Sequence, residues 1–153
     1  MRSCSYTVLP MKRSHIQACS AIVAASEPWK TLGETVDFRK YISSRQAFIC
    51  KSENHLAGFI IFTAEPVFAR GGYLRAIGVA PSMRGQGIGT RLLEFAESKT
   101  ARRCGSMYLC VSSFNRRGMN FYKKNGYIRV GRIPGLISPD ASEHIFWKRF
   151  NQF

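Results

Sequence analysis

The sequence predicts a mixed α/β domain built around one sheet. Hydrophobic residues make up 45% of the 153 residues, which is a globular composition with enough chain for one core. Short apolar runs alternate along the chain with segments whose apolar residues recur at helical spacing. Glycine, proline and asparagine fall between these segments, where turns are required. We therefore expect one domain over residues 1–153, with strands and helices interleaved.

The first half is expected to hold a strand, two helices and a hairpin. Ile16, Cys19 and Val23 lie at helical spacing, and the helix that they predict is broken near Pro28. A polar turn at residues 52–55 joins two apolar, strand-like runs. The predicted elements are a strand at 6–9, helices at 13–25 and 34–42, and strands at 47–51 and 56–63.

The second half is expected to alternate strands and helices before a final pair of strands. Leu92, Phe95 and Ala96 line one face of a helix that Gly105 follows as a stop signal. A loop rich in proline and glycine separates the last two strands. The predicted elements are a strand at 73–79, a helix at 90–103, a strand at 107–111, a helix at 115–124, and strands at 127–131 and 143–148.

The net charge is +14, and the basic excess is concentrated in the second half of the chain. Residues 66–153 carry 15 basic and 4 acidic side chains, whereas residues 27–65 carry 5 of each. Such a basic half fits an anionic partner, either a phosphorylated cofactor or a nucleic acid. A solvated basic surface that aids solubility accounts for the charge equally well.

Cysteine and histidine usage points away from disulfides and metals. The 5 cysteines are odd in number and form no C-x-x-C pair, which is typical of a reducing compartment. His15, His55 and His144 lie far apart, so no metal is expected. No apolar run approaches the roughly 20 residues of a membrane helix, and the N-terminus has no apolar signal segment. We therefore expect a cytoplasmic protein with no membrane partner.

A glycine-rich loop stands between the predicted strand at 73–79 and the helix that follows. Gly85, Gly87 and Gly89 let the backbone turn tightly and approach a ligand closely. The first N–H groups of the helix lack internal partners and favour an anion such as a phosphate. No Walker motif occurs, and the G-x-G-x-x-G pattern fails at its last position. An ordinary strand-to-helix turn is the alternative.

Two motifs together resemble the GCN5-related N-acetyltransferase (GNAT) superfamily. Arg84, Gly87 and Gly89 match its acetyl-CoA signature, R/Q-x-x-G-x-G/A. Asn115 and residues 121–127 match its second element, an Asn followed by a helix that ends F/L-Y-x-x-x-G-F/Y. The resemblance implies a single mixed, mostly antiparallel sheet with splayed central strands, flanked by helices. It also implies transfer of an acetyl group from acetyl-CoA to an amine, by a monomer or a homodimer.

The resemblance further implies which residues hold acetyl-CoA. Main chain of Ile77, Gly78 and Val79 would pair with the pantetheine arm. Asn115 would bond to the pantetheine and Tyr122 would lie near the thioester sulfur; their spacing of seven places both on one helix face. An N-cap for Asn115 and a core position for Tyr122 are the alternatives. Backbone N–H groups that would hold the pyrophosphate belong to Arg84, Gly85, Gln86, Gly87, Ile88, Gly89 and Thr90.

The reaction requires that the acceptor amine lose a proton and that the leaving thiolate gain one. Tyr122 is assigned the second role. Many relatives carry an acidic residue on the strand before the signature, where this chain has Arg75 and Ala76, so Glu143 on the last strand is the leading base candidate. Cys110 is a candidate nucleophile, with a small buried hydrophobe as the simpler interpretation. Other base candidates are Glu27, Glu65 and a chain of waters.

The acceptor is expected to be a small primary amine. The charge of +14 repels polyamines and basic peptide tails, whereas residues 27–65 are neutral overall and hold the apolar Trp29 and Leu32. The alternatives are a protein N-terminus or lysine, a non-catalytic CoA-binding sensor, and a nucleic-acid-binding module; no specific nucleic acid is expected. Candidate pocket residues, for which core packing is the alternative, are Trp29, Leu32, Phe38, Tyr41, Ile133, Leu136 and Ile137.

Overall fold

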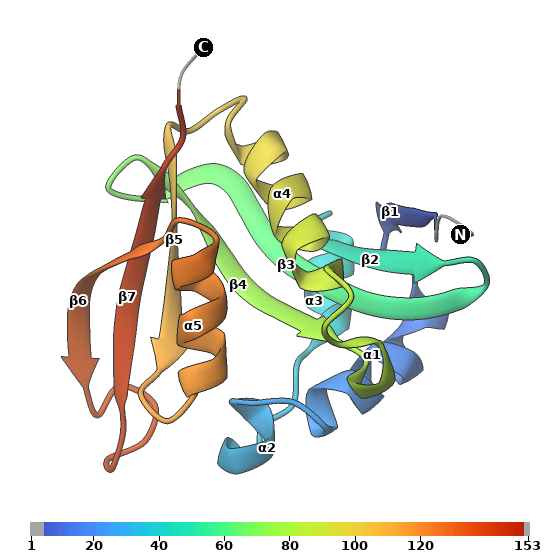
Figure 1. The fold of residues 1–153 in the computed structure, drawn as a ribbon, viewed down its shortest axis with the longest axis horizontal. Coiled ribbons are helices and arrows are strands. Elements are labelled where there is room, and N and C mark those ends of the chain that lie inside the picture. The colour runs from blue at the N-terminus through green and yellow to red at the C-terminus, as the bar shows by residue number, and fades with distance from the viewer. Residues whose placement is uncertain (1–4, 152–153) are drawn as a thin grey trace. The chain divides into compact units, whose positions relative to one another are not determined.

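A computed structural model describes residues 5–151 (Figure 1). Its strands are hydrogen-bonded in the order β1-β2-β3-β4-β5-β7-β6. The β4–β5 pair is parallel, and the β1–β2, β2–β3, β5–β7 and β6–β7 pairs are antiparallel. The expected mostly antiparallel sheet is therefore confirmed. The described chain divides into two compact units, residues 5–62 with 76–96 (the first unit) and residues 63–75 with 97–151 (the second unit).

The elements follow the alternation predicted from the sequence. The strands are β1 (Tyr6–Pro10), β2 (Ala47–Ser52), β3 (His55–Phe68), β4 (Gly71–Val79), β5 (Ser106–Ser112), β6 (Ile128–Pro134) and β7 (Ser142–Arg149). The α-helices are α1 (Ile16–Ala24), α2 (Trp29–Leu32), α3 (Phe38–Ser43), α4 (Ile88–Thr100) and α5 (Arg116–Lys124). Two short 3₁₀ turns are η1 (Arg13–His15) and η2 (Pro81–Met83).

The first unit depends on the alternation of side chains along β2 and β3. Ile49 and Phe59 join the buried cluster that α1 and α3 cover on one face of these strands. Their strand neighbours Phe48 and Phe62 point to the other face and pack on Phe95 of α4, with ring centroids 4.9 and 6.2 Å apart respectively. Helices therefore cover both faces of this part of the sheet.

The second unit is centred on β5. Leu74 and Phe146 flank Leu109 in register, and all three are at most 2% exposed. The β4–β5 pairing ends at Leu74↔Leu109, although the two strands continue to Val79 and Ser112. The pairing thus ends before either strand does, as the expected splay of the central strands requires.

Two sequence predictions in the N-terminal half are wrong. The predicted helix at 34–42 begins only at Phe38, and the short helix α2, which follows the expected break near Pro28, was not predicted. The backbone N–H of Lys30 donates to the carbonyl of Ser26 at 2.9 Å, and Gly33 ends α2 with φ of 64°. A glycine in the left-handed region is a common helix end, so Gly33 separates α2 from α3, where only the helix at 34–42 was predicted.

The β3 strand is longer than predicted. Its end was missed because the turn that follows it carries no strong sequence signal. Ala69 and Arg70 both have positive φ, 42° and 65°, as a two-residue hairpin turn with the twist of its strands requires. Asn-Gly is the usual sequence for such a turn, and its absence here conceals the hairpin. The helix predicted at 90–103 also differs, since α4 spans Ile88–Thr100.

Candidate active site

The glycine-rich loop of the first unit has the geometry of an anion cradle. Gly85 and Gly87 have φ of 77° and 80°, a conformation that side-chain-bearing residues rarely adopt. A Cβ built on either glycine would meet no atom within 4 Å, so both face open space. The glycines thus keep the loop curved and leave room for a ligand to approach the main chain.

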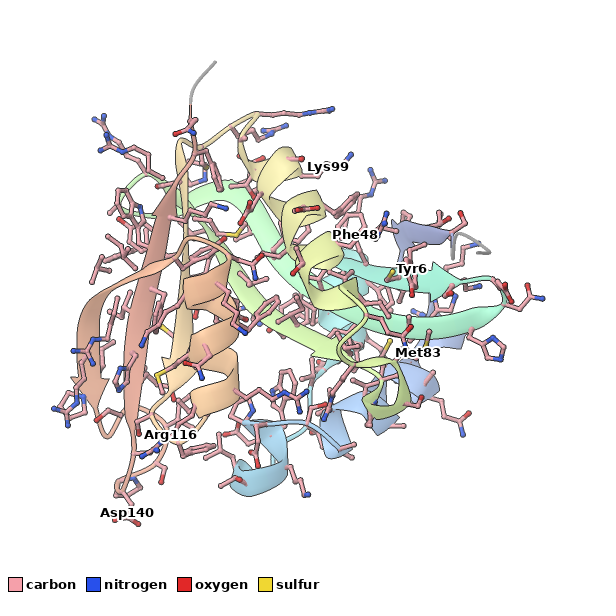
Figure 2. The ribbon with its side chains drawn as sticks, in the orientation of Figure 1. Tyr6, Phe48, Met83, Lys99, Arg116 and Asp140 are labelled. Atoms are coloured by element: carbon pink, nitrogen blue, oxygen red, sulfur yellow. The ribbon has the colours of Figure 1, made fainter. Side chains whose placement is uncertain are left out.

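The first turn of α4 adds hydrogen-bond donors to this loop. Its first helical hydrogen bond runs from the N–H of Arg91 to the carbonyl of Gly87 at 3.0 Å. Helix geometry leaves the preceding N–H groups, those of residues 88–90, without helical acceptors. Tyr6 of β1 flanks the loop, and its hydroxyl donates to Gln86 Oε1 at 3.1 Å. The Arg91 guanidinium lies 5.3 Å from the centroid of the Tyr6 ring. Figure 2 labels Tyr6 together with Met83, which precedes the loop.

Arg84 contributes more to the first unit than its backbone. Its Nη2 donates to Ser26 Oγ at 2.9 Å and to the carbonyl of Ala25 at 3.3 Å, while Nε donates to the carbonyl of Val79 at 3.3 Å. The motif predicted a role for the main chain of Arg84 only. The side chain joins the end of β4 to the residues that follow α1.

Gly78, one of the three residues expected to pair with pantetheine, is required by packing. A Cβ on Gly78 would lie 2.6 Å from Phe59 Cε1 and 2.9 Å from Ile22 Cγ2. A Cβ on Gly58 would lie 2.6 Å from the carbonyl oxygen of Gly78. Real Cβ atoms are not found this close to other atoms, so β3 and β4 can approach only through glycine. Ile77 and Val79 are half-buried neighbours on β4.

Polar side chains gather on one face of the strands of the second unit. The Cα partners Ser112↔Glu143 place β5 and β7 side chains opposite each other, and Cys110 lies two residues earlier on the same face of β5. Tyr73 of β4 lies close enough to Cys110 for each side chain to affect the pKa of the other. Tyr73 belongs to neither motif; its sequence signal is a tyrosine on the strand before the glycine loop.

Glu143 is a buried carboxylate with a strong hydrogen bond. Ser112 Oγ donates to Glu143 Oε1 at 2.5 Å, and the two residues are 1% and 5% exposed. The other base candidates have structural contacts: Glu27 accepts from the N–H and hydroxyl of Thr31, and Glu65 forms an exposed ion pair with Arg103 at 2.6 Å.

Tyr122 is a buried phenol, 8% exposed, on α5. Burial, and secondarily the nearby Tyr73 side chain, raise the pKa of Tyr122 well above its usual value. Burial likewise raises the pKa of Tyr73. Both phenols therefore stay protonated at neutral pH and are able to donate a proton or a hydrogen bond.

Asn115 takes the helix-capping role that its sequence position also allowed. Its Oδ1 accepts from the N–H of Gly118 at 3.0 Å, at the start of α5. Figure 2 labels Arg116, the first residue of this helix. The cap uses the carboxamide oxygen, and the amide NH₂ of the same side chain is a separate hydrogen-bond donor.

The described cysteines are not activated as nucleophiles. Cys19, Cys50, Cys104 and Cys110 are free thiols, and Cys4 lies outside the described residues. Burial is the main cause that raises the pKa of Cys110, so its thiolate is disfavoured as a nucleophile. Burial also raises the pKa of Cys19 to about 12.

The candidate acceptor residues fall into two groups. In the first unit, Phe38 is 2% exposed, and Trp29 and Tyr41 pack against the same core, so for these residues the core-packing alternative is supported. In the second unit the hairpin side chains are exposed. Their exposed fractions are 37% for Ile133, 55% for Leu136 and 49% for Ile137.

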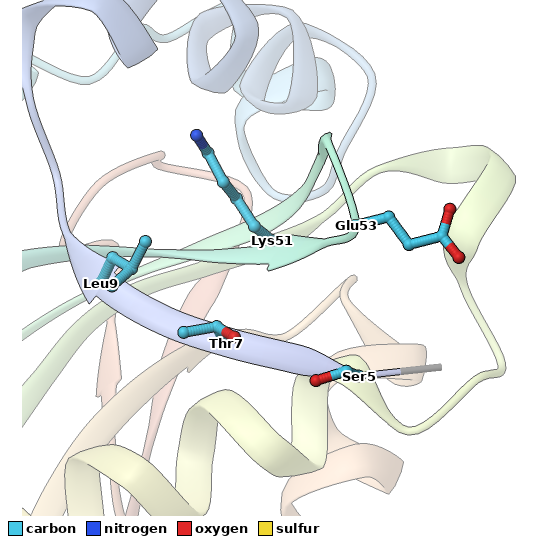
Figure 3. Close-up of a pocket in the computed structure, with 5 residues that line it drawn as sticks. All are labelled: Ser5, Thr7, Leu9, Lys51 and Glu53. Carbon is cyan, nitrogen blue, oxygen red and sulfur yellow. The ribbon is translucent and has the colours of Figure 1, made fainter. Parts of the chain in front are cut away.

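A hollow on β1 and β2 lies apart from the motif residues (Figure 3). It is lined by Ser5, Thr7, Leu9, Lys51 and Glu53. Ser5 and Thr7 alternate with Tyr6 along β1, so the hollow opens on the strand face opposite the one that meets the loop. Within residues 5–151, no cluster of three or more metal-binding side chains occurs. In the same residues, no helix is long and apolar enough to cross a membrane.

The mostly antiparallel sheet and the glycine loop before α4 define the N-acetyltransferase class of fold. The chain belongs to the Acetyltransferase (GNAT) family, whose model matches residues 14–127. Two curated relatives are the acetyltransferase Atu2258 of Agrobacterium fabrum, 35% identical over 80 residues, and the thialysine N-epsilon-acetyltransferase of Mus musculus, 36% identical over 82 residues. These matches cover 51% and 53% of this chain and 56% and 48% of the relatives, so the chain spans about half of their length.

Solved structures share the fold over nearly the whole chain. Ard1 from Thermoplasma volcanium has a TM-score of 0.78 at 19% identity, with 96% of this chain and 99% of that chain covered. Arabidopsis thaliana Naa50, solved with the bisubstrate analogue CoA-Ac-MVNAL, has a TM-score of 0.77 at 19% identity, with 95% and 99% covered. At this level of identity the likeness concerns the fold.

Proposed function

We propose that this protein transfers an acetyl group from acetyl-CoA to the primary amine of a small molecule. The observation that carries the proposal is the loop of Gly85 and Gly87, whose positive φ values open the main chain to an anion beside the N-terminus of α4. Family membership supports acetyl-CoA as the source of that anion. The backbone N–H groups of residues 84–90 hold the pyrophosphate, and the main chain of residues 77–79 pairs with the pantetheine arm.

The polar face of the second unit supplies the proton chemistry in this proposal. Glu143, held by Ser112, takes the proton of the acceptor ammonium, since an amine attacks only when neutral. Tyr122, protonated because it is buried, donates to the departing thiolate. The amine attacks the thioester carbonyl directly, and Cys110 takes no covalent part because burial disfavours its thiolate.

A small amine is favoured as acceptor by charge and by one relative. The net charge of +14 repels polycationic acceptors such as lysine-rich tails. A relative whose name specifies the ε-amine of thialysine matches this chain at 36% identity over 82 residues.

The test is a panel of acceptors incubated with acetyl-CoA while free thiol release is followed. The panel holds thialysine and other small amines, neutral peptides with a single N-terminal amine, and lysine-rich peptides, ranked by kcat/KM. We expect a small amine to rank first. First rank for an N-terminal or lysine-rich peptide would overturn the acceptor, and failure to bind acetyl-CoA in calorimetry would overturn the activity.

A further inference from the structure

Ser26 lies in the junction between α1 and α2, within the first unit. Its hydroxyl donates to the carbonyl of Ile22 in the last turn of α1 at 2.5 Å. Its own carbonyl accepts from the N–H of Lys30 at 2.9 Å, in the first turn of α2. The residue is 7% exposed, so its hydroxyl contact is shielded from water. Its position therefore sets where α2 begins relative to α1.

Arg84 reaches this junction from the glycine loop. Its Nη2 donates to Ser26 Oγ at 2.9 Å and its Nε donates to the carbonyl of Val79 at 3.3 Å. The donor is charged, which makes these contacts stronger than neutral hydrogen bonds. One guanidinium thus connects the end of β4 and the loop that follows it to the residues between α1 and α2.

A second contact path joins the same elements through packing. Phe59 lies against Gly78 of β4, where a Cβ would be 2.6 Å from its ring. The Trp29 ring of α2 packs on Phe59 with centroids 6.1 Å apart. A shift of β4 at Gly78 would therefore displace the Phe59 ring on which Trp29 packs, because protein interiors are close-packed.

We propose that Arg84 and Ser26 are positioning residues that couple cofactor binding at the loop to the placement of α2. This inference rests on the proposed function, in which the loop holds acetyl-CoA, and on the sequence-based prediction that the segment of α2 borders the acceptor. A ligand on the main chain of Gly85–Gly87 fixes the adjacent Arg84, which in turn fixes Ser26 and the first turn of α2. Acetyl-CoA binding then orders the segment that receives the amine.

Trp29 reports on α2 directly. The chain has 2 tryptophans, so Trp147→Phe leaves Trp29 as the single indole emitter. In this background we expect acetyl-CoA to lower the acrylamide quenching of Trp29 about twofold. Ser26→Ala should abolish that response and raise the KM of the amine that ranks first in the acceptor panel about tenfold. The calorimetric Kd of acetyl-CoA and kcat should change less than about threefold.

Ser44→Ala is the matched control. Ser44 Oγ donates to the carbonyl of Lys40 at 3.1 Å, four residues earlier, as Ser26 does to Ile22, but Ser44 is exposed and ends α3. This variant should keep the Trp29 response. Ser26→Thr retains a hydroxyl and should restore it. Arg84→Lys, which keeps the charge but loses the planar fork, should also abolish the Trp29 response at saturating acetyl-CoA if Ser26→Ala does not fold.

The outcomes separate the inference from the function on which it rests. Absence of acetyl-CoA binding in the unaltered protein would remove the proposed function. Binding without a change in Trp29 quenching would overturn the coupling and leave that function intact. A loss of acetyl-CoA affinity in Ser26→Ala as large as the rise in KM would also overturn it, because the contact would then serve the loop alone.

Discussion

The loop of the first unit offers main-chain groups to a ligand, whereas the polar face of the second unit offers side chains. In the proposed function, the loop binds its ligand through main-chain N–H donors, and Gly85 and Gly87 leave open space for it because they have no side chains. In the second unit, the groups are the buried side chains of Ser112 on β5, Glu143 on β7 and Tyr122 on α5. Binding by main chain depends on backbone shape, whereas proton transfer depends on one atom of one side chain.

This comparison predicts that single side-chain deletions act most strongly in the second unit. Tyr122→Phe keeps the ring contacts and removes only the hydroxyl. We expect kcat to fall about 10²- to 10⁴-fold, the range for general acid catalysis, with acetyl-CoA affinity little changed. The matched control is Tyr127→Phe, a tyrosine 2% exposed whose ring lies 5.8 Å from that of Tyr122. Equal loss in both variants would remove Tyr122 from the chemistry.

Glu143→Gln sharpens the comparison within the same face. The amide preserves shape and an acceptor for Ser112, but it cannot take a proton. We expect kcat/KM at pH 7 to fall about 10²-fold, at the low end for general base catalysis, and the acidic limb of its pH profile to disappear. Glu65→Gln, at the exposed pair with Arg103, should be neutral. A retained acidic limb in Glu143→Gln would assign the base elsewhere.

Gly87→Val tests the main-chain side of the comparison. Valine is strained at φ of 80°, by roughly 1–2 kcal/mol, and its side chain enters the open space in front of the loop. We expect the Kd of acetyl-CoA to rise at least about tenfold, since about 1.4 kcal/mol is one factor of ten. Gln86→Ala, which removes only the contact with Tyr6, should change the Kd less than about threefold. Calorimetry on both variants would show whether the main chain or the side chains bind.

The smallest expected effect is a loss of stability at acidic pH, to which one histidine in each unit contributes. Burial is the first cause that lowers the pKa of His15 and of His144, followed for His15 by Lys51 and for His144 by Arg129. The unfolded chain therefore binds protons more readily, and stability should fall as the pH drops below the ordinary value of about 6.5.

Protonation of His15 also conflicts with its Nδ1, which accepts from the N–H of Lys12 at 3.0 Å. The loss should reach a few degrees in Tm at most between pH 7 and pH 5. His15→Gln and His144→Gln should each reduce the acid sensitivity, with His55→Gln as an exposed control. A pH-independent Tm in the unaltered protein would contradict this prediction.

The regular part of the fold could be predicted because its signals are local. The apolar runs of β2 and β5, the helical spacing of α4, and the Gly loop between β4 and α4 each lie within a short stretch of sequence. The predictions that failed also concerned short stretches of sequence. Pro28 indicated a break and not the start of α2, and the β3 turn at Ala69 and Arg70 lacks the residues that mark such turns. In both cases neighbouring structure, rather than intrinsic propensity, decided the conformation.

The sequence by itself determined the family, the loop and the candidate residues, because each motif is a contiguous pattern. The tertiary structure alone decided what those residues touch. Ser112 and Glu143 are 31 positions apart, and Arg84 and Ser26 are 58 apart, so no periodicity relates them. Hydrogen bonds of this kind depend on strand register and on where helices end, which are settled only when the whole core packs.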